Sequence, residues 1–183
     1  MRMKTVGVIG AGQMGSGIAQ VAAASGFEVV MQDISSEGLE RGKTRIEQGF
    51  AKLSEKGKIS HTDAKAALAR ISTTQAIDEF SRVDIVIEAA TESEAIKAEL
   101  FRKLDGICGE GAILATNTSS ISITRIAAQT KRPESVVGMH FMNPVPLMKL
   151  VELIRGLRTS DESFRAVRDL AEKMGKTWVE SRD

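Results

Sequence analysis

The feature that most constrains the fold is a glycine-rich turn near the start of the chain. An apolar run at residues 6–9 leads directly into Gly10-Ala11-Gly12-Gln13-Met14-Gly15, and a helical pattern follows to about Ser25. In such a turn the first glycine permits the tight bend, the second lets an anionic group approach the backbone, and the third allows helix and strand to pack closely. Exposed N–H groups at a helix start attract anions. The segment therefore predicts a phosphate-binding strand–turn–helix unit.

An acidic residue follows this turn at the spacing that dinucleotide-binding units require. A second apolar run, residues 27–31, ends close to Asp33, whose carboxylate could accept hydrogen bonds from an adenosine ribose. Its negative charge would repel a 2′-phosphate, and Ile34 and Ser35 offer no cation to hold one. The pattern therefore favours NAD over NADP as the cofactor. A helix N-cap or turn role is the structural alternative for Asp33.

Strand patterns alternate with helical patterns along the rest of the chain. Strands are expected near residues 71–73, 83–88, 112–115, 136–137, 149–154 and 177–179, and helices near residues 36–55, 62–70, 93–107, 123–129 and 161–174. This alternation predicts an α/β fold with a doubly wound, mostly parallel sheet of the Rossmann type. The helical hairpin at about residues 36–70 is longer than a plain crossover needs, so we expect it to be an insertion.

Composition limits the kinds of partner. The net charge of +1 and an aromatic content of 4% argue against a nucleic-acid surface, and no apolar run approaches membrane-spanning length. Cys108 is the single cysteine, which excludes a disulfide framework and a thiolate metal cluster. We expect a cytoplasmic protein without a metal site.

The segment at residues 138–148 holds one of the two histidines and two of the three prolines. Pro144 and Pro146 cannot continue a strand ladder, so the chain is expected to leave the sheet just beyond His140. Ligands bind at that edge of an open α/β sheet. Imidazole exchanges protons near neutrality, and Glu152 on the next strand pattern could return beside it. His140 is therefore a candidate general base, with a hydrogen-bonded structural histidine as the alternative.

Two segments resemble the L-3-hydroxyacyl-CoA dehydrogenase family, and the similarity extends from Val8 to the end of the chain. They are Asn117-Thr118-Ser119-Ser120 and Gly138-Met139-His140-Phe141-Met142-Asn143-Pro144-Val145-Pro146-Leu147-Met148-Lys149-Leu150-Val151-Glu152. The chain is most similar to the bacterial 3-hydroxybutyryl-CoA dehydrogenases. The resemblance implies NAD-dependent, reversible oxidation of an (S)-3-hydroxyacyl-CoA to the 3-oxoacyl-CoA, in fatty acid beta-oxidation or butanoate metabolism.

The resemblance also implies roles for individual residues. It makes His140 the base, Glu152 its partner, and Ser119 the group that binds the substrate oxygen. Together with the glycine turn, the expected cofactor contacts are Gly10, Ala11, Gly12, Gln13, Met14, Gly15, Asp33, Glu92, Lys97, Asn117, Ser119 and Asn143. Ser119 and Asn143 are also expected to contact the substrate, and Lys56 to meet its CoA moiety. Seven positions before Lys56 the family often has a serine, but Gly49 stands there in this sequence, so the contact of that serine is not carried over.

In this family an all-helical domain follows the NAD-binding domain and forms the dimer interface. We therefore expect residues 1–183 to be the NAD-binding domain, with the helical domain missing. The whole protein is expected to be a homodimer. The domain alone could be a monomer with feeble or no turnover, since catalysis depends on closely held groups. A non-catalytic NAD-binding module and a β-hydroxyacid dehydrogenase acting on free acids are the alternatives.

Overall fold

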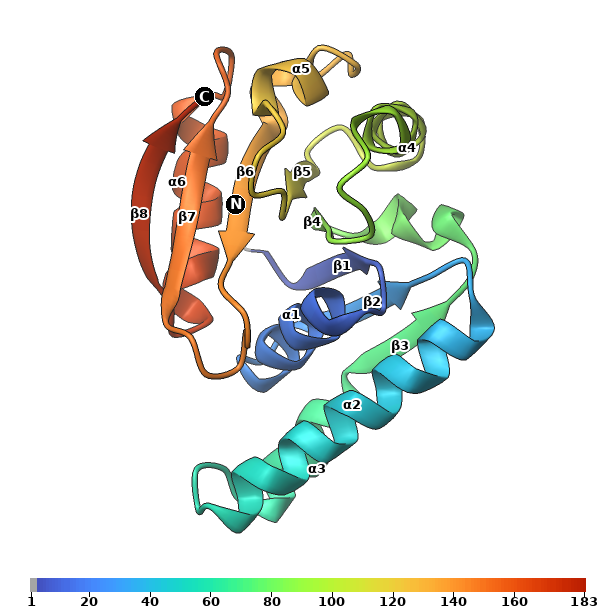
Figure 1. The fold of residues 1–183 in the computed structure, drawn as a ribbon, viewed down its shortest axis with the longest axis vertical. Coiled ribbons are helices and arrows are strands. Elements are labelled where there is room, and N and C mark those ends of the chain that lie inside the picture. The colour runs from blue at the N-terminus through green and yellow to red at the C-terminus, as the bar shows by residue number, and fades with distance from the viewer. Residues whose placement is uncertain (1–2) are drawn as a thin grey trace.

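The computed structural model describes residues 3–183, which form an eight-stranded sheet with helices on both of its faces (Figure 1). The strand order is β3-β2-β1-β4-β5-β6-β7-β8. Within these residues every neighbouring pair of strands is parallel except β6 and β7, which are antiparallel. The predicted doubly wound, mostly parallel sheet is confirmed.

The elements follow the predicted alternation closely. The strands are β1 Thr5–Ile9, β2 Glu28–Gln32, β3 Ile71–Thr74, β4 Ile85–Glu88, β5 Ile113–Thr116, β6 Val136–Phe141, β7 Leu150–Arg155 and β8 Thr177–Arg182. The helices are α1 Gln13–Ala24, α2 Ser36–Glu55, α3 His61–Ala69, α4 Glu94–Ile107, α5 Ile123–Ala127 and α6 Asp161–Lys173, with short 3-10 helices η1 Ile77–Arg82 and η2 Pro133–Ser135. Neither 3-10 helix was predicted, and β6 runs past the predicted residues 136–137 to Phe141.

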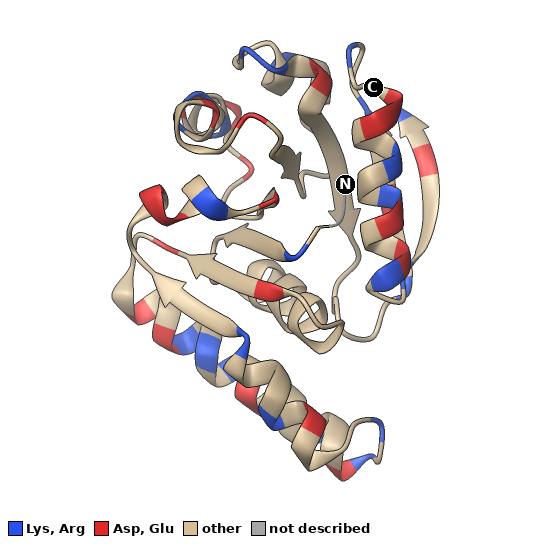
Figure 2. Ribbon diagram, turned by 180° about the vertical axis from the view of Figure 1, so that it is seen from behind, with Lys and Arg blue, Asp and Glu red and all other residues tan. Residues whose placement is uncertain are grey.

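The sheet is buried between two hydrophobic clusters. Because successive side chains of a strand point to opposite faces, Val6 and Val8 join the first cluster and Ile9 joins the second. Helices α1, α2, α3 and α6 contribute to the first cluster, whereas α4, α5 and η1 contribute to the second. Figure 2 shows charged residues of both signs along the outer helices, few on the central strands and none on α1. Amphipathic helices thus shield a largely apolar sheet.

The predicted helical hairpin is formed by α2 and α3, which extend away from the sheet (Figure 1). Ser35 caps α2, since its hydroxyl accepts a hydrogen bond from the N–H of Gly38 at 3.0 Å. Ser60 caps α3 in the same way, through the N–H of Asp63 at 3.0 Å. Helix α2 packs on α1, with Gly42 beside Ala11 and Gly49 beside Gln20, which brings the hairpin beside the glycine-rich turn.

Candidate active site

The turn between β1 and α1 depends on glycine at three positions for different reasons. Gly10 has a φ of +96°, which disfavours other residues. A Cβ atom on Gly15 would lie 1.8 Å from the carbonyl oxygen of Gly10, so no side chain fits there. A Cβ on Gly12 would meet no protein atom within 4 Å, because Gly12 faces open space at the start of α1. A side chain would fill that space, and its absence fits a diphosphate resting on the helix N-terminus.

Asp33 lies directly beside this turn, just past the end of β2. Its carboxylate accepts hydrogen bonds from the N–H groups of Ala11 at 2.8 Å and Ser35 at 3.0 Å. Since Ser35 is the N-cap of α2, the alternative of Asp33 as that helix's N-cap is wrong. Asp33 instead joins the glycine turn to the start of α2, where its carboxylate can also meet a ribose.

Arg45 of α2 is a further cation at the turn that the sequence reading missed. Its guanidinium donates to the carbonyl oxygen of Ala11 and to the hydroxyl of Ser16, both at 3.2 Å. No local sequence motif distinguishes Arg45 from the other basic residues of α2. Only the packing of the hairpin on α1 places it here.

His140 and Glu152 face each other across the antiparallel strands β6 and β7. The imidazole Nδ1 lies 2.8 Å from a carboxylate oxygen, Oε2, of Glu152. The side chains are 21% and 41% exposed, so the pair is reachable from solvent. A carboxylate at Nδ1 favours the tautomer with its proton on Nδ1, which leaves Nε2 as an acceptor. The predicted pairing is confirmed, and its geometry suits proton transfer at Nε2.

Two further predicted residues lie near the carboxyl ends of β4 and β5. The carboxylate of Glu92 accepts hydrogen bonds from the hydroxyl of Thr118 at 2.8 Å and from the N–H of Ser119 at 3.2 Å. Ser119 is exposed, and the N-cap of α5 is Ser122, so Ser119 does not cap that helix. Glu92 therefore holds the loop that presents Ser119 at this edge of the sheet.

Asn117 ties this loop to the strand of His140. Its side-chain oxygen accepts a hydrogen bond from the N–H of Phe141 at 2.8 Å, and its own N–H donates to the carbonyl of Glu88 at 2.8 Å. Asn117 is not the N-cap of α5 either. It links the ends of three strands, which fixes the position of His140 relative to Ser119.

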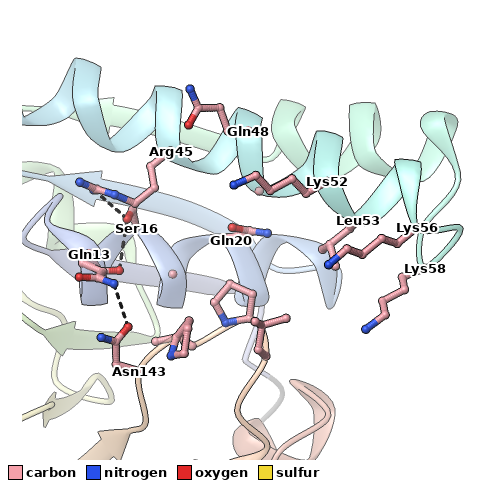
Figure 3. Close-up of a pocket in the computed structure, with 16 residues that line it drawn as sticks. Gln13, Ser16, Gln20, Arg45, Gln48, Lys52, Leu53, Lys56, Lys58 and Asn143 are labelled. Carbon is pink, nitrogen blue, oxygen red and sulfur yellow. Dashed lines mark hydrogen bonds between the residues drawn. The ribbon is translucent and has the colours of Figure 1, made fainter.

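Asn143 connects the histidine segment to the glycine turn. The Gln13 amide donates to the side-chain oxygen of Asn143 at 3.0 Å, as Figure 3 shows. Met14, next to Gln13, is partly buried against the first hydrophobic cluster. The predicted departure of the chain from the sheet after β6 is also confirmed, because Pro144 and Pro146 lie in the loop before β7. The predicted cofactor turn and the predicted base are thus joined at one edge of the sheet.

Lys97 is enclosed rather than presented to solvent. It is 1% exposed, and its ammonium contacts the carboxylate of Glu88, which is 0% exposed. The Thr116 hydroxyl donates to the same carboxylate at 2.8 Å, and the N–H of Ala90 donates to its other oxygen at 2.9 Å. The charges of Lys97 and Glu88 compensate each other within this network. A direct contact of Lys97 with a cofactor stays a prediction.

A groove of about 330 Å³ runs between α1, α2 and the loop after β6 (Figure 3). Gln13 and Asn143 lie at one end, and Figure 3 shows lysines at the other. The lysines at that end are Lys56 and Lys58, and Lys52 lies nearer the middle on α2, so the predicted CoA contact Lys56 lines the groove. The positive charges of these lysines would attract the phosphate groups of a ligand in the groove.

Residues 3–183 contain no group of three or more His, Cys, Asp or Glu side chains placed to hold a metal ion. None of the helices described for this chain combines the length and apolar character needed to cross a membrane.

Comparison with known proteins identifies the family. The family described as 3-hydroxyacyl-CoA dehydrogenase, NAD binding domain, matches residues 5–183. A probable 3-hydroxybutyryl-CoA dehydrogenase of Bacillus subtilis (strain 168) is 55% identical over 183 residues, which are 100% of this chain and 64% of the relative. The fatty acid oxidation complex subunit alpha of Idiomarina loihiensis is 44% identical over 175 residues, 96% of this chain and 24% of that protein.

A solved structure agrees with these relatives. The crystal structure of (S)-3-hydroxybutyryl-CoA dehydrogenase from Ralstonia eutropha matches with a TM-score of 0.97 and 47% identity, covering 100% of this chain and 64% of that one. The chain thus spans a little under two thirds of the length of these 3-hydroxybutyryl-CoA dehydrogenases. The chain belongs to the 3-hydroxyacyl-CoA dehydrogenase family, whose NAD-binding domain its residues 5–183 match.

Proposed function

We propose that the protein catalyses the NAD-dependent, reversible oxidation of an (S)-3-hydroxyacyl-CoA to the 3-oxoacyl-CoA, with 3-hydroxybutyryl-CoA as the substrate. The observation that carries the proposal is the His140–Glu152 pair, with Nδ1 and Oε2 2.8 Å apart at the edge of the sheet that also holds the glycine turn. Family membership and the names of the similar enzymes support it.

The central chemical task of the side chains is to move one proton. His140 Nε2 takes the proton of the substrate hydroxyl, and Glu152 holds the proton on Nδ1 and stabilises the imidazolium. In the reverse direction His140 returns that proton to the oxygen. The hydroxyl of Ser119 binds the same substrate oxygen. NAD, when bound, accepts the hydride from the carbon that carries this oxygen.

The cofactor would be held mainly by backbone groups. The open space at Gly12 and the start of α1 suit the diphosphate, and Asp33 suits the adenosine ribose. Glu92 and Lys97 are proposed near the nicotinamide ribose. Their carboxylate and ammonium are held by Thr118 and by Glu88, respectively. Asn117 and Asn143 complete the proposed polar surroundings.

The groove favours a CoA ester over a free hydroxyacid. Lys56 and Lys58 lie at the end away from Asn143, where the phosphates of a CoA moiety could reach them. A free 3-hydroxyacid carries no phosphate groups for these cations to bind. The lysines therefore argue against a β-hydroxyacid dehydrogenase acting on free acids, and for an acyl-CoA as the small-molecule partner.

Other properties of the whole protein are proposed from the family resemblance alone. They are a helical domain after the NAD-binding domain, a homodimer formed through it, and a cytoplasmic location without nucleic-acid or membrane partners. The single, buried Cys108 thiol is compatible with a reducing compartment.

The test titrates the 183-residue chain with NADH, acetoacetyl-CoA and acetoacetate, and follows NADH oxidation with the protein in excess over the oxo compound. We expect binding of NADH and acetoacetyl-CoA, with slow NADH oxidation by the thioester only. Binding of NADH without any thioester binding would instead support the non-catalytic module. Equal oxidation by free acetoacetate would support the free-acid enzyme.

A further inference from the structure

Gln20 of α1 is a buried polar side chain that the proposed reaction does not use. The residue is 4% exposed, and its amide nitrogen, Nε2, is buried without a hydrogen-bond partner among the residues that the structure describes. An unpaired buried donor is unfavourable, and polar groups inside proteins nearly always have a partner. This amide therefore calls for an explanation.

The amide sits at the middle of the groove rather than in the core. Figure 3 shows Gln20 between the Gln13–Asn143 end and the lysine end, and it is one of the residues that line the groove. Across from it on α2, a Cβ atom on Gly49 would lie 2.4 Å from the amide oxygen and 2.8 Å from Nε2. The missing side chain at Gly49 thus leaves room for the amide of Gln20.

A CoA thioester that follows this groove would place a particular group beside Gln20. Its phosphates would lie at Lys56 and Lys58, and its thioester would lie toward Asn143. The part between them is the pantetheine arm, which carries two amide carbonyl groups. A carbonyl oxygen is the acceptor that an unpaired N–H donor lacks.

We propose that Gln20 binds the pantetheine arm, with Nε2 donating a hydrogen bond to one of its amide carbonyl oxygens. The terminal amide torsion of glutamine is broad and roughly two-fold, so a rotation about it can turn Nε2 from its buried position toward the groove. The inference rests on the proposed acyl-CoA substrate and adds a contact that is independent of the phosphates. Gln20 therefore recognises the arm of the thioester, whereas the lysines recognise its charged end.

The test compares acetoacetyl-CoA with acetoacetyl-pantetheine, which has the arm but lacks the nucleotide. Gln20→Met removes the amide with little change of volume. We expect it to weaken binding of both thioesters equally, by about three- to tenfold, and to leave NADH affinity unchanged. Lys56→Ala is expected to weaken acetoacetyl-CoA alone. Gln129→Met, the same exchange beyond α5 on the opposite side of the sheet, is the matched control.

A second readout does not depend on the variant folding. In the unaltered chain labelled with nitrogen-15, the side-chain amide signal of Gln20 should shift on addition of pantetheine. An unmoved signal, or normal thioester affinity in Gln20→Met, overturns the inference while acetoacetyl-CoA binding leaves the proposed function standing. Failure of every thioester to bind overturns both.

Discussion

His140 and Glu152 occupy opposed positions on β6 and β7, and their side chains meet with Nδ1 and Oε2 2.8 Å apart. Directly opposed residues of an antiparallel pair project to the same face of a sheet. In a parallel arrangement a glutamate twelve residues along the chain could not return to this position. The reversal of direction at β7 therefore brings the imidazole of His140 and the carboxylate of Glu152 together.

The charge of Glu152 is expected to matter more than its size. Glu152→Gln keeps the shape but replaces the carboxylate with an amide, which can donate to Nδ1 and favour the wrong tautomer. We predict that the rate of NADH oxidation by acetoacetyl-CoA falls about 10²- to 10⁴-fold, with NADH affinity unchanged. Rapid-mixing measurements with Glu162→Gln, an exposed residue of α6, as the control would check this. A loss of less than threefold would contradict the assigned role.

A substitution at Gly12 is expected to weaken cofactor binding without affecting folding. A Cβ there meets no atom within 4 Å beyond its chain neighbours, so Gly12→Ala should unfold at nearly the same temperature as the unaltered chain, within the small cost of alanine at an N-cap. The added methyl group would occupy the space proposed for the diphosphate, and we predict at least about tenfold weaker NADH binding, or about 1.4 kcal/mol. Gly106→Ala, at a second glycine with open space around it, should bind NADH normally. Unchanged affinity in Gly12→Ala would place the diphosphate elsewhere.

The buried Lys97–Glu88 pair should dominate the stability of its region. Lys97→Met leaves the carboxylate of Glu88 buried without its counter-ion, which is expected to cost about 3–5 kcal/mol of unfolding free energy. Combining it with Glu88→Gln removes that charge and should restore part of the loss. Urea unfolding of the two single variants and the double variant measures the coupling. Strictly additive losses would show that the pair does not act as a unit.

The thiol of Cys108 predicts a loss of stability at high pH. Burial raises the pKa of the Cys108 thiol to about 11, although the nearby Arg132 opposes the shift. An unfolded chain ionises its thiol near pH 9, so the folded state loses stability as the pH rises from about 9 to about 11. The loss should be on the order of 2 kcal/mol. The unfolding free energy should fall less steeply between pH 9 and 11 in Cys108→Ala than in the unaltered chain. The same pH dependence in both proteins would contradict the prediction.

The fold could be predicted largely because strand and helix patterns are local. The glycine turn and the hairpin are examples, since bends, caps and periodic apolar residues lie close together in the sequence. The 3-10 helix η1 at residues 77–82 was missed because so short a segment shows no helical period. The end of β6 at Phe141 agrees with the prediction that the strand ends close to His140, because Pro144 and Pro146 cannot continue a strand ladder.

The site could be predicted only in part, because its geometry depends on contacts between distant segments. The order of the parallel strands was enough to bring Asp33, Ser119 and His140 to one edge. The contacts of Arg45 with the glycine turn arise from packing of the hairpin on α1, which no spacing encodes. The unpaired amide of Gln20 likewise becomes visible only once α1 and α2 are placed side by side.

The role of His140 as the base is tested most directly by the rate of NADH oxidation by acetoacetyl-CoA in a single turnover. This rate is compared between the unaltered chain and His140→Ala. The affinities for NADH and thioester are measured on the same samples, so that loss of chemistry is distinguished from loss of binding. We predict retained affinities and a rate that falls at least about 10²-fold. A variant that binds both ligands and keeps most of its rate would contradict His140 as the base.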